Sequence, residues 1–162
     1  EQQQSFEKAV ALANPGIGLL LLLSAVSLLI PHASVITTAF SKADYASLIN
    51  HPLLLVGLFD CVMAGCLFLA VTEVYPLLRG RGMLGCGFGL YLGWALGDPL
   101  VMAACATAGV AIFYATIAQN YAVMLATLLL GIIGNGALAY LACMGHFSEF
   151  FERVHFNLLT VV

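Results

Sequence analysis

Residues 84–100 read LGCGFGLYLGWALGDPL, and this stretch decides how the chain folds. Glycines recur in it every four residues, at Gly85, Gly89, Gly93 and Gly97. Positions four residues apart lie on one face of a helix. Because glycine has no side chain, such a face lets another helix or a flat ligand approach closely. The pattern therefore predicts a helix face that packs against another helix or a partner.

The end of this stretch, Gly97-Asp98-Pro99, allows two interpretations. Proline removes a hydrogen bond from a helix interior and kinks it. We favour one long helix over residues 83–114 that is kinked at these three residues. Asp98 and Pro99 are also the residues expected at the cap and first position of a new helix. In that second interpretation a helix begins at Asp98, and residues 84–96 form a re-entrant or surface-lying segment.

The composition around this stretch points to a membrane. Of the 162 residues, 62% are hydrophobic and 8% are charged, and the mean hydropathy is +1.04. An average soluble domain is about 45–50% apolar and about 25% charged. The net charge of −3 forms no basic patch for binding nucleic acid. We therefore expect an all-α integral membrane protein that binds no nucleic acid.

The apolar segments predict a single domain with four transmembrane helices. The predicted spans cover residues 16–40, 52–76, 83–114 and 121–144. Residues 1–14 form a polar N-terminal segment, and residues 145–162 form a tail that lies along the membrane surface. Four spans place both termini on the same side of the membrane.

The basic residues orient these spans. Lys8, Arg79, Arg81 and Arg153 fall on one side and Lys42 on the other. Basic residues favour the inner side. We therefore expect both termini to face the cytoplasm or its organellar equivalent, with a mitochondrial or plastid inner membrane as the suspected location.

Two acids fall deep inside the predicted spans, Asp60 and Asp98. A carboxylate at the bilayer centre costs about 2.5–3.5 kcal/mol on insertion scales, so such residues usually face protein or water. The helical rise places both acids at a similar depth, and no basic residue falls at that depth in any span. We expect them to be neutral and hydrogen-bonded. They are the catalytic candidates if the protein is an enzyme.

Two histidines suggest a cofactor. His32 lies in the first predicted span and His51 opens the second, both toward the outer side. Imidazole is a common axial ligand of haem and chlorophyll. A haem or pigment site at His32 and His51 is one hypothesis, and two interfacial histidines without a ligand is the other. No spacing of cysteine and histidine typical of a metal site is present.

The leading functional hypothesis is a structural or accessory subunit of a larger membrane complex. It rests on the small extramembrane mass, the glycine face and the lack of a recognisable catalytic motif. Respiratory, photosynthetic and ATP-synthase assemblies are complexes of this kind, so the expected partners are lipids and other membrane subunits. The alternative is a membrane enzyme or binder for a sterol, quinone or lipid that uses Asp60 and Asp98.

Overall fold

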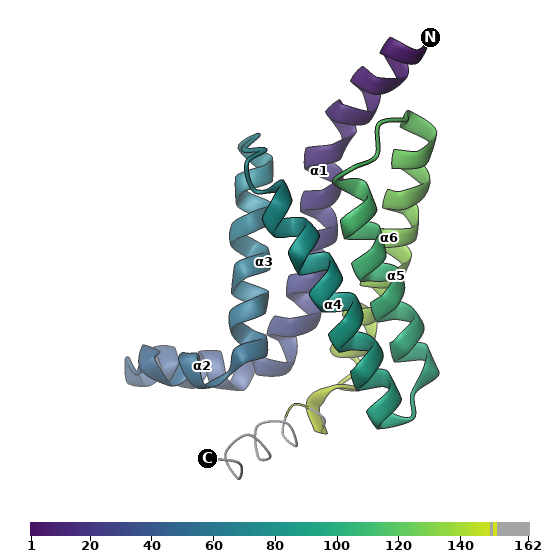
Figure 1. Ribbon diagram of the computed structural model, residues 1–162. Helices are drawn as coiled ribbons and strands as arrows, with labels where there is room; N and C mark the ends of the chain where they lie inside the picture. The colour runs from purple at the N-terminus through teal and green to yellow at the C-terminus, as the bar shows by residue number, and fades with distance from the viewer. Residues whose placement is uncertain (150, 152–162) are drawn as a thin grey trace.

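The structure, a computed structural model, describes residues 1–149 and 151, and their regular secondary structure is helical throughout. Five helices of 17 residues or more form the body of the molecule (Figure 1). They are α1 (Gln2–Leu29), α3 (Pro52–Phe68), α4 (Tyr75–Leu96), α5 (Pro99–Ala115) and α6 (Tyr121–Cys143). Shorter helices link α1 to α3: η1 (Ile30–His32), α2 (Ala33–Lys42) and η2 (Tyr45–Asn50).

The first helix differs from the prediction at both ends. It begins at Gln2 and continues through Pro15, so residues 1–14 are not a separate segment. Ala9 and Ala13 are buried there, which means that packing extends the helix toward the N-terminus. At the other end, Pro31 ends α1 after Leu29. Beyond η1, α2 runs across the end of the bundle (Figure 1).

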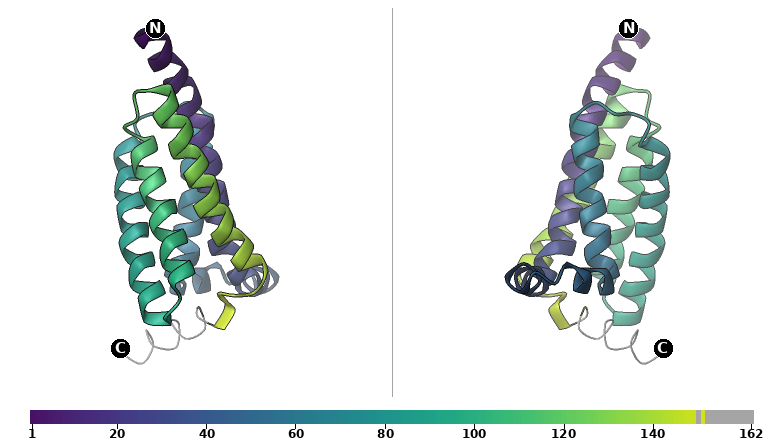
Figure 2. Two further views of the ribbon diagram at one scale, coloured as in Figure 1. Left: turned by 90° about the vertical axis from the view of Figure 1, so that its right-hand side faces the viewer. Right: turned by 90° about the vertical axis from the view of Figure 1, so that its left-hand side faces the viewer.

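The favoured continuous helix over residues 83–114 is wrong. The chain reverses at Gly97, and α4 and α5 run antiparallel, side by side (Figure 2). Gly97 adopts the left-handed conformation with φ of +65°, which glycine accepts without steric cost and which commonly ends a helix. Asp98 then caps α5, and Pro99 occupies the first turn. Residues 84–96 belong to α4, a helix of 22 residues that packs along α5.

The long helices pack in the order α3, α1, α6, α5, α4. This row curls so that its two ends, α3 and α4, face each other, but their backbones do not pack together along their lengths. We call this boundary the α3–α4 seam. The N-terminus lies at one end of the bundle and α6 ends at the other (Figure 1). The two ends of the described chain therefore lie at opposite ends of the bundle, and this arrangement gives no support to the prediction of termini on one side.

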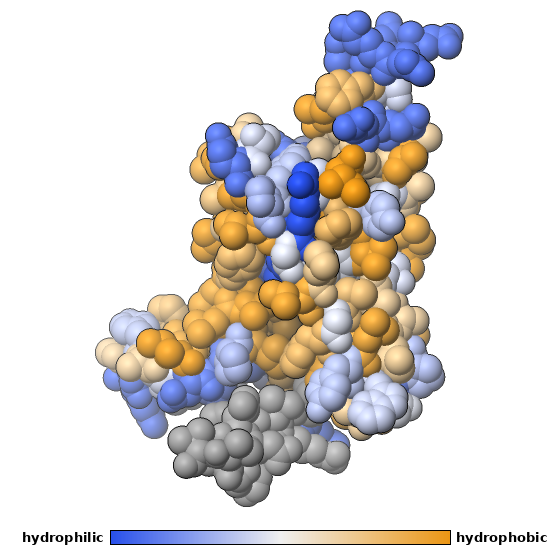
Figure 3. Space-filling view, in the orientation of Figure 1, coloured by the Kyte–Doolittle hydropathy of each residue, from blue (hydrophilic) through white to orange (hydrophobic). Residues whose placement is uncertain are grey.

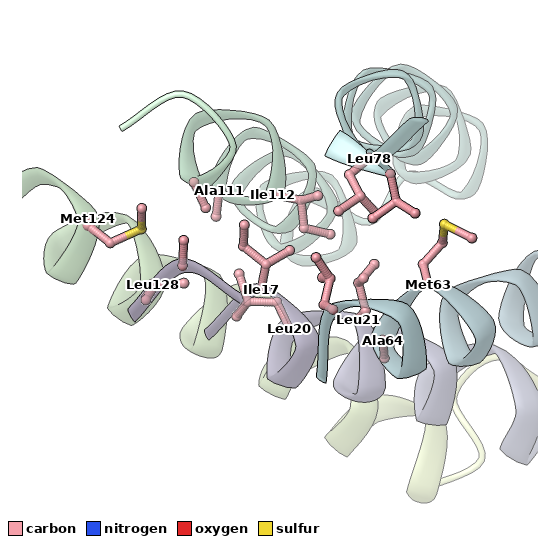
Figure 4. Packing of buried hydrophobic residues seen from close by; sticks show 14 of the residues in the cluster. Ile17, Leu20, Leu21, Met63, Ala64, Leu78, Ala111, Ile112, Met124 and Leu128 are labelled. Carbon is pink, nitrogen blue, oxygen red and sulfur yellow. The ribbon is translucent and has the colours of Figure 1, made fainter. Parts of the chain in front are cut away.

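All five long helices contribute to one apolar core. Ile17, Leu20 and Leu21 of α1 lie at its centre, and Leu78 of α4 approaches Met63 of α3 there (Figure 4). The core also includes Ala64, Leu67, Ala111, Ile112, Met124 and Leu128. Leu78 lies in the first turn of α4, close to the connection from α3. The core therefore joins α3 and α4 at that end of the two helices.

Two helical stretches of the described chain are long and apolar enough to cross a membrane, Gln2–Lys42 and Tyr121–Cys143. Pro52–Phe68 and Pro99–Ala115 are shorter apolar helices. The predicted count of four spans thus loses its basis, because it depended on joining α4 and α5. On the face shown in Figure 3 apolar residues cover most of the bundle, and hydrophilic residues gather at the N-terminal end and around α2. The predicted surface-lying tail, 145–162, falls mostly outside the described residues.

Candidate functional site

Asp60 lies at the middle of α3, eight residues from either end, and is fully buried. Its carboxylate faces α1, where the Ser24 hydroxyl donates a hydrogen bond to Oδ2 over 2.7 Å. Ser24 is itself buried, and it interrupts a run of leucines in α1. The α1–α3 contact therefore carries one polar interaction within an apolar interface.

Arg81 completes this cluster from α4. Its Nε donates to Asp60 Oδ1 and its Nη2 to Asp60 Oδ2, both at 2.8 Å, and Nη2 also donates to Ser24 Oγ at 3.1 Å. The expectation that no basic residue matches the depth of Asp60 is wrong. Arg79-Gly80-Arg81-Gly82 resembles a polar loop in sequence, but it forms the first half of α4. As part of this helix, Arg81 lies at the same height in the bundle as Asp60.

The geometry makes this cluster an ion pair. Two parallel N–H···O bonds to one carboxylate form the bidentate arrangement that arginine favours. The Arg81 side chain is only 15% exposed and that of Asp60 is not exposed at all. The sequence predicts an acid without a basic neighbour, whereas the Asp60 carboxylate lies directly against the Arg81 guanidinium. The ion pair links α3 to α4, and Ser24 ties both to α1.

The glycine series in α4 serves three separate purposes. A side chain at Gly85 would collide with Nη1 of Arg81, so this glycine makes room for the guanidinium. Gly89 and Gly93 face α5, where a side chain would collide with Cys105 and Met102. Gly97 ends the helix. Two of the four glycines of the predicted packing face, Gly89 and Gly93, thus lie against α5 of the same chain.

Asp98 lies far from Asp60. It follows Arg81, the partner of Asp60, by 17 residues, which is about 25 Å along a helix. Asp98 Oδ1 accepts hydrogen bonds from the backbone nitrogens of Leu100 and Val101. Its Oδ2 lies 2.9 Å from Nε2 of His146, just beyond α6. The predicted shared depth of the two acids does not hold, because it relied on the continuous helix.

The environment of Asp98 holds its carboxylate in the charged form. The hydrogen bond from His146 is the largest influence and lowers the pKa of Asp98, and the two backbone hydrogen bonds lower it further. Partial desolvation opposes them. Asp98 therefore acts as a charged helix cap at the end of the bundle, outside the long helices.

His32 and His51, the two histidines of the haem or pigment hypothesis, lie close together in the structure. Their ring centroids are 5.7 Å apart in an edge-to-face arrangement at the junction between α1 and α3. His32 is buried, its Nδ1 lies 2.7 Å from the Leu28 carbonyl oxygen, and its ring packs 4.9 Å from that of Phe151. The two rings touch each other directly. A haem or pigment between them remains a hypothesis that this contact neither requires nor tests.

The described residues contain no group of three or more histidine, cysteine or acidic side chains that could hold a metal ion. Among the described residues, Ser24, Asp60 and Arg81 form a cluster with a fully buried charge, and it can clamp three helices or present hydrogen-bond donors at the seam. No protein-family model matches the sequence, and no curated protein or solved structure is significantly similar to it. Sequence reasoning missed Ser24 and Arg81 as members of the cluster.

Proposed function

We propose that the protein is an integral membrane protein that serves as a structural or accessory subunit of a larger membrane complex, of the respiratory, photosynthetic or ATP-synthase type. Its interior charges support a structural role. Both oxygens of the Asp60 carboxylate accept hydrogen bonds from Arg81 and Ser24, so this group is poorly placed to transfer protons. The protein would then act through contacts that its surface makes with partner subunits.

The exposed apolar face of α4 is the observation that carries this proposal. Leu84, Tyr91 and Trp94 are 74%, 61% and 71% exposed, although they belong to a helix whose opposite face packs tightly on α5. Large exposed apolar patches mark membrane or protein interaction sites. Tryptophan and tyrosine are also enriched among the residues that dominate binding energy at interfaces. This face suits a lipid-embedded partner helix.

We place the end of the bundle that carries Lys8 and Arg79 toward the cytoplasm or its organellar equivalent. Basic residues near the ends of membrane spans favour that side, and Arg79 lies in the first turns of α4. Arg81 does not count in this comparison because its charge is paired within the bundle. The opposite end carries Lys42 on α2. An organellar inner membrane stays part of the proposal.

The alternative of an enzyme that uses Asp60 and Asp98 together receives no support from the geometry. The two carboxylates lie at different levels, and each has its own partner, Arg81 and His146. A second candidate function that needs both acids in one site is therefore not proposed.

Gentle detergent extraction followed by native electrophoresis tests the subunit role. We expect migration far above the 17.1 kDa of the free chain. Trp94→Ala should shift the protein toward the free chain while its helix content is unchanged. Tyr45→Ala, which truncates an exposed aromatic residue on η2, is the matched control. Migration of the unmodified protein as a free monomer would contradict the proposal.

A further inference from the structure

The guanidinium of Arg81 uses only part of its hydrogen-bonding capacity. Arginine has five N–H donors. Nε and Nη2 are engaged by Asp60 and Ser24, whereas Nη1 has no hydrogen-bond partner among the described residues. No buried side-chain nitrogen or oxygen of those residues lacks a partner. Nη1 must therefore belong to the part of Arg81 that reaches the surface.

This open edge lies at the α3–α4 seam. Arg81 reaches across the seam from α4 to Asp60, and Nη1 rests over Gly85, one turn further along the helix. Phe88 occupies the same face of α4, seven residues after Arg81, and is 45% exposed. The seam thus combines two unpaired N–H donors with an exposed aromatic ring.

The charge balance selects the kind of group that these donors can bind. Asp60 and Arg81 neutralise each other, so a second anion would leave a net negative charge in an apolar environment, which is costly. A neutral carbonyl oxygen can accept the hydrogen bonds without that cost. An N–H group left unpaired in an apolar environment costs about 1–3 kcal/mol. Binding such an acceptor would remove this penalty.

The depth of the pair selects the source of the carbonyl. Asp60 lies eight residues from each end of α3, which is about 12 Å along the helix. In a hydrocarbon core about 30 Å thick, this position is near the middle of the membrane. The ester groups of phospholipids lie at the edges of that core. A carbonyl compound dissolved in the bilayer interior fits better.

We propose that Arg81, through Nη1 at the α3–α4 seam, binds the carbonyl oxygen of a neutral lipophilic molecule of the quinone class. Phe88 provides a ring for the ring of the ligand to pack against. This inference rests on the membrane part of the proposed function and is independent of the subunit role.

The test uses the full chain in nanodiscs of ether-linked phosphatidylcholine, which has no ester carbonyls. Insertion is first established by resistance to carbonate extraction, and failure at this stage would overturn the membrane assignment itself. Labelled 2-decyl-1,4-benzoquinone is then titrated, with protein-free discs as the background. Decylbenzene, which has the same chain and ring without the carbonyl oxygens, is the matched probe.

We expect saturable binding of the quinone and none of decylbenzene. Arg81→Lys keeps the positive charge next to Asp60 but removes the Nη1 donors that bind the ligand. It should weaken quinone binding about tenfold, equivalent to ~1.4 kcal/mol. Arg79→Lys is the control on the same helix, because Arg79 bonds Thr116 and not Asp60. It should change binding less than twofold.

Three results would overturn the inference. The first is equal binding of both probes to the unmodified protein, a comparison that requires no variant to fold. The second is unchanged quinone binding in a folded Arg81→Lys protein. The third is loss of quinone binding in discs of ester-linked lipid, which would show that phospholipid esters occupy the seam in place of a quinone.

Discussion

Asp60 and Asp98 look equivalent in sequence, since both are lone acids in apolar stretches, yet the fold gives them opposite environments. Asp60 is fully buried at the middle of α3 and paired to Arg81. Asp98 caps α5 at the end of the bundle and meets His146, whose side chain is 44% exposed. The comparison shows that the depth of a charge in a helical protein depends on where the chain turns as much as on local hydropathy.

The largest difference between the two sites should appear on neutralising each acid. Asp60→Asn removes the negative charge and leaves the Arg81 guanidinium largely buried without compensation. Breaking a buried ion pair costs about 3–5 kcal/mol, and we expect a loss of free energy of unfolding near the lower end of that range. Denaturant titration of the protein in detergent micelles, followed by circular dichroism, measures it.

A double variant provides the control for this loss. Asp60→Leu combined with Arg81→Met replaces both charges by apolar groups, which is often neutral or stabilising at buried pairs. It should recover most of the stability that Asp60→Asn loses. If Asp60→Asn itself changed the stability by less than about 1 kcal/mol, the pair would behave as a weak surface ion pair, contrary to its burial.

The glycine face of α4 should give the next largest effect. At Gly89 a side chain would collide with Cys105 of α5, whereas Gly87 has open space where its side chain would be. Gly89→Ala should therefore destabilise the protein by about 1–3 kcal/mol through overpacking. Gly87→Ala should be neutral or stabilising by up to about 1 kcal/mol, because alanine is the better helix former. Equal effects at the two positions would contradict the α4–α5 packing.

The sequence predicts the helical class, but not the path of the chain at Gly97. Both interpretations of Gly97-Asp98-Pro99 follow from local rules, since proline can kink a helix or begin one. The reversal is favoured because Gly97 adopts a left-handed conformation and Gly89 and Gly93 then pack on α5. That contact joins residues on two helices, so no local pattern reveals it.

Arg81 was missed for a different reason. Two arginines separated by glycine are typical of a loop, and the positive-inside rule places them outside the membrane. A signal was nevertheless present, because Leu78, Arg81, Gly85 and Phe88 follow the three- and four-residue spacing of one helix face. Read as a helix, this spacing places Arg81 on the face of α4 that lies at the α3–α4 seam, where it reaches Asp60.

A smaller effect is expected at the cap of α5. Asp98→Ala removes the side-chain acceptor for the backbone nitrogens of Leu100 and Val101. Loss of a helix cap costs about 0.5–2 kcal/mol. Asp98→Asn keeps an acceptor at this position and should cost much less. Thermal unfolding of both variants in micelles tests this prediction, and equal losses in the two would show that the charge, not the cap, matters.

The smallest expected effect is the dependence of folding stability on low pH. The hydrogen bond from His146, together with those from the backbone, lowers the pKa of Asp98 in the folded protein below its ordinary value of 3.8. A carboxyl group whose pKa is lower when folded stabilises the fold above its unfolded pKa, and this contribution is lost as the pH falls through the folded pKa. The loss should thus begin below about pH 4. Stability measured from pH 6 to pH 2 should fall less steeply in Asp98→Asn than in the unmodified protein, because the amide does not titrate. Parallel curves would mean that Asp98 has the same pKa in the folded and unfolded chains, and that its contact with His146 contributes nothing to stability.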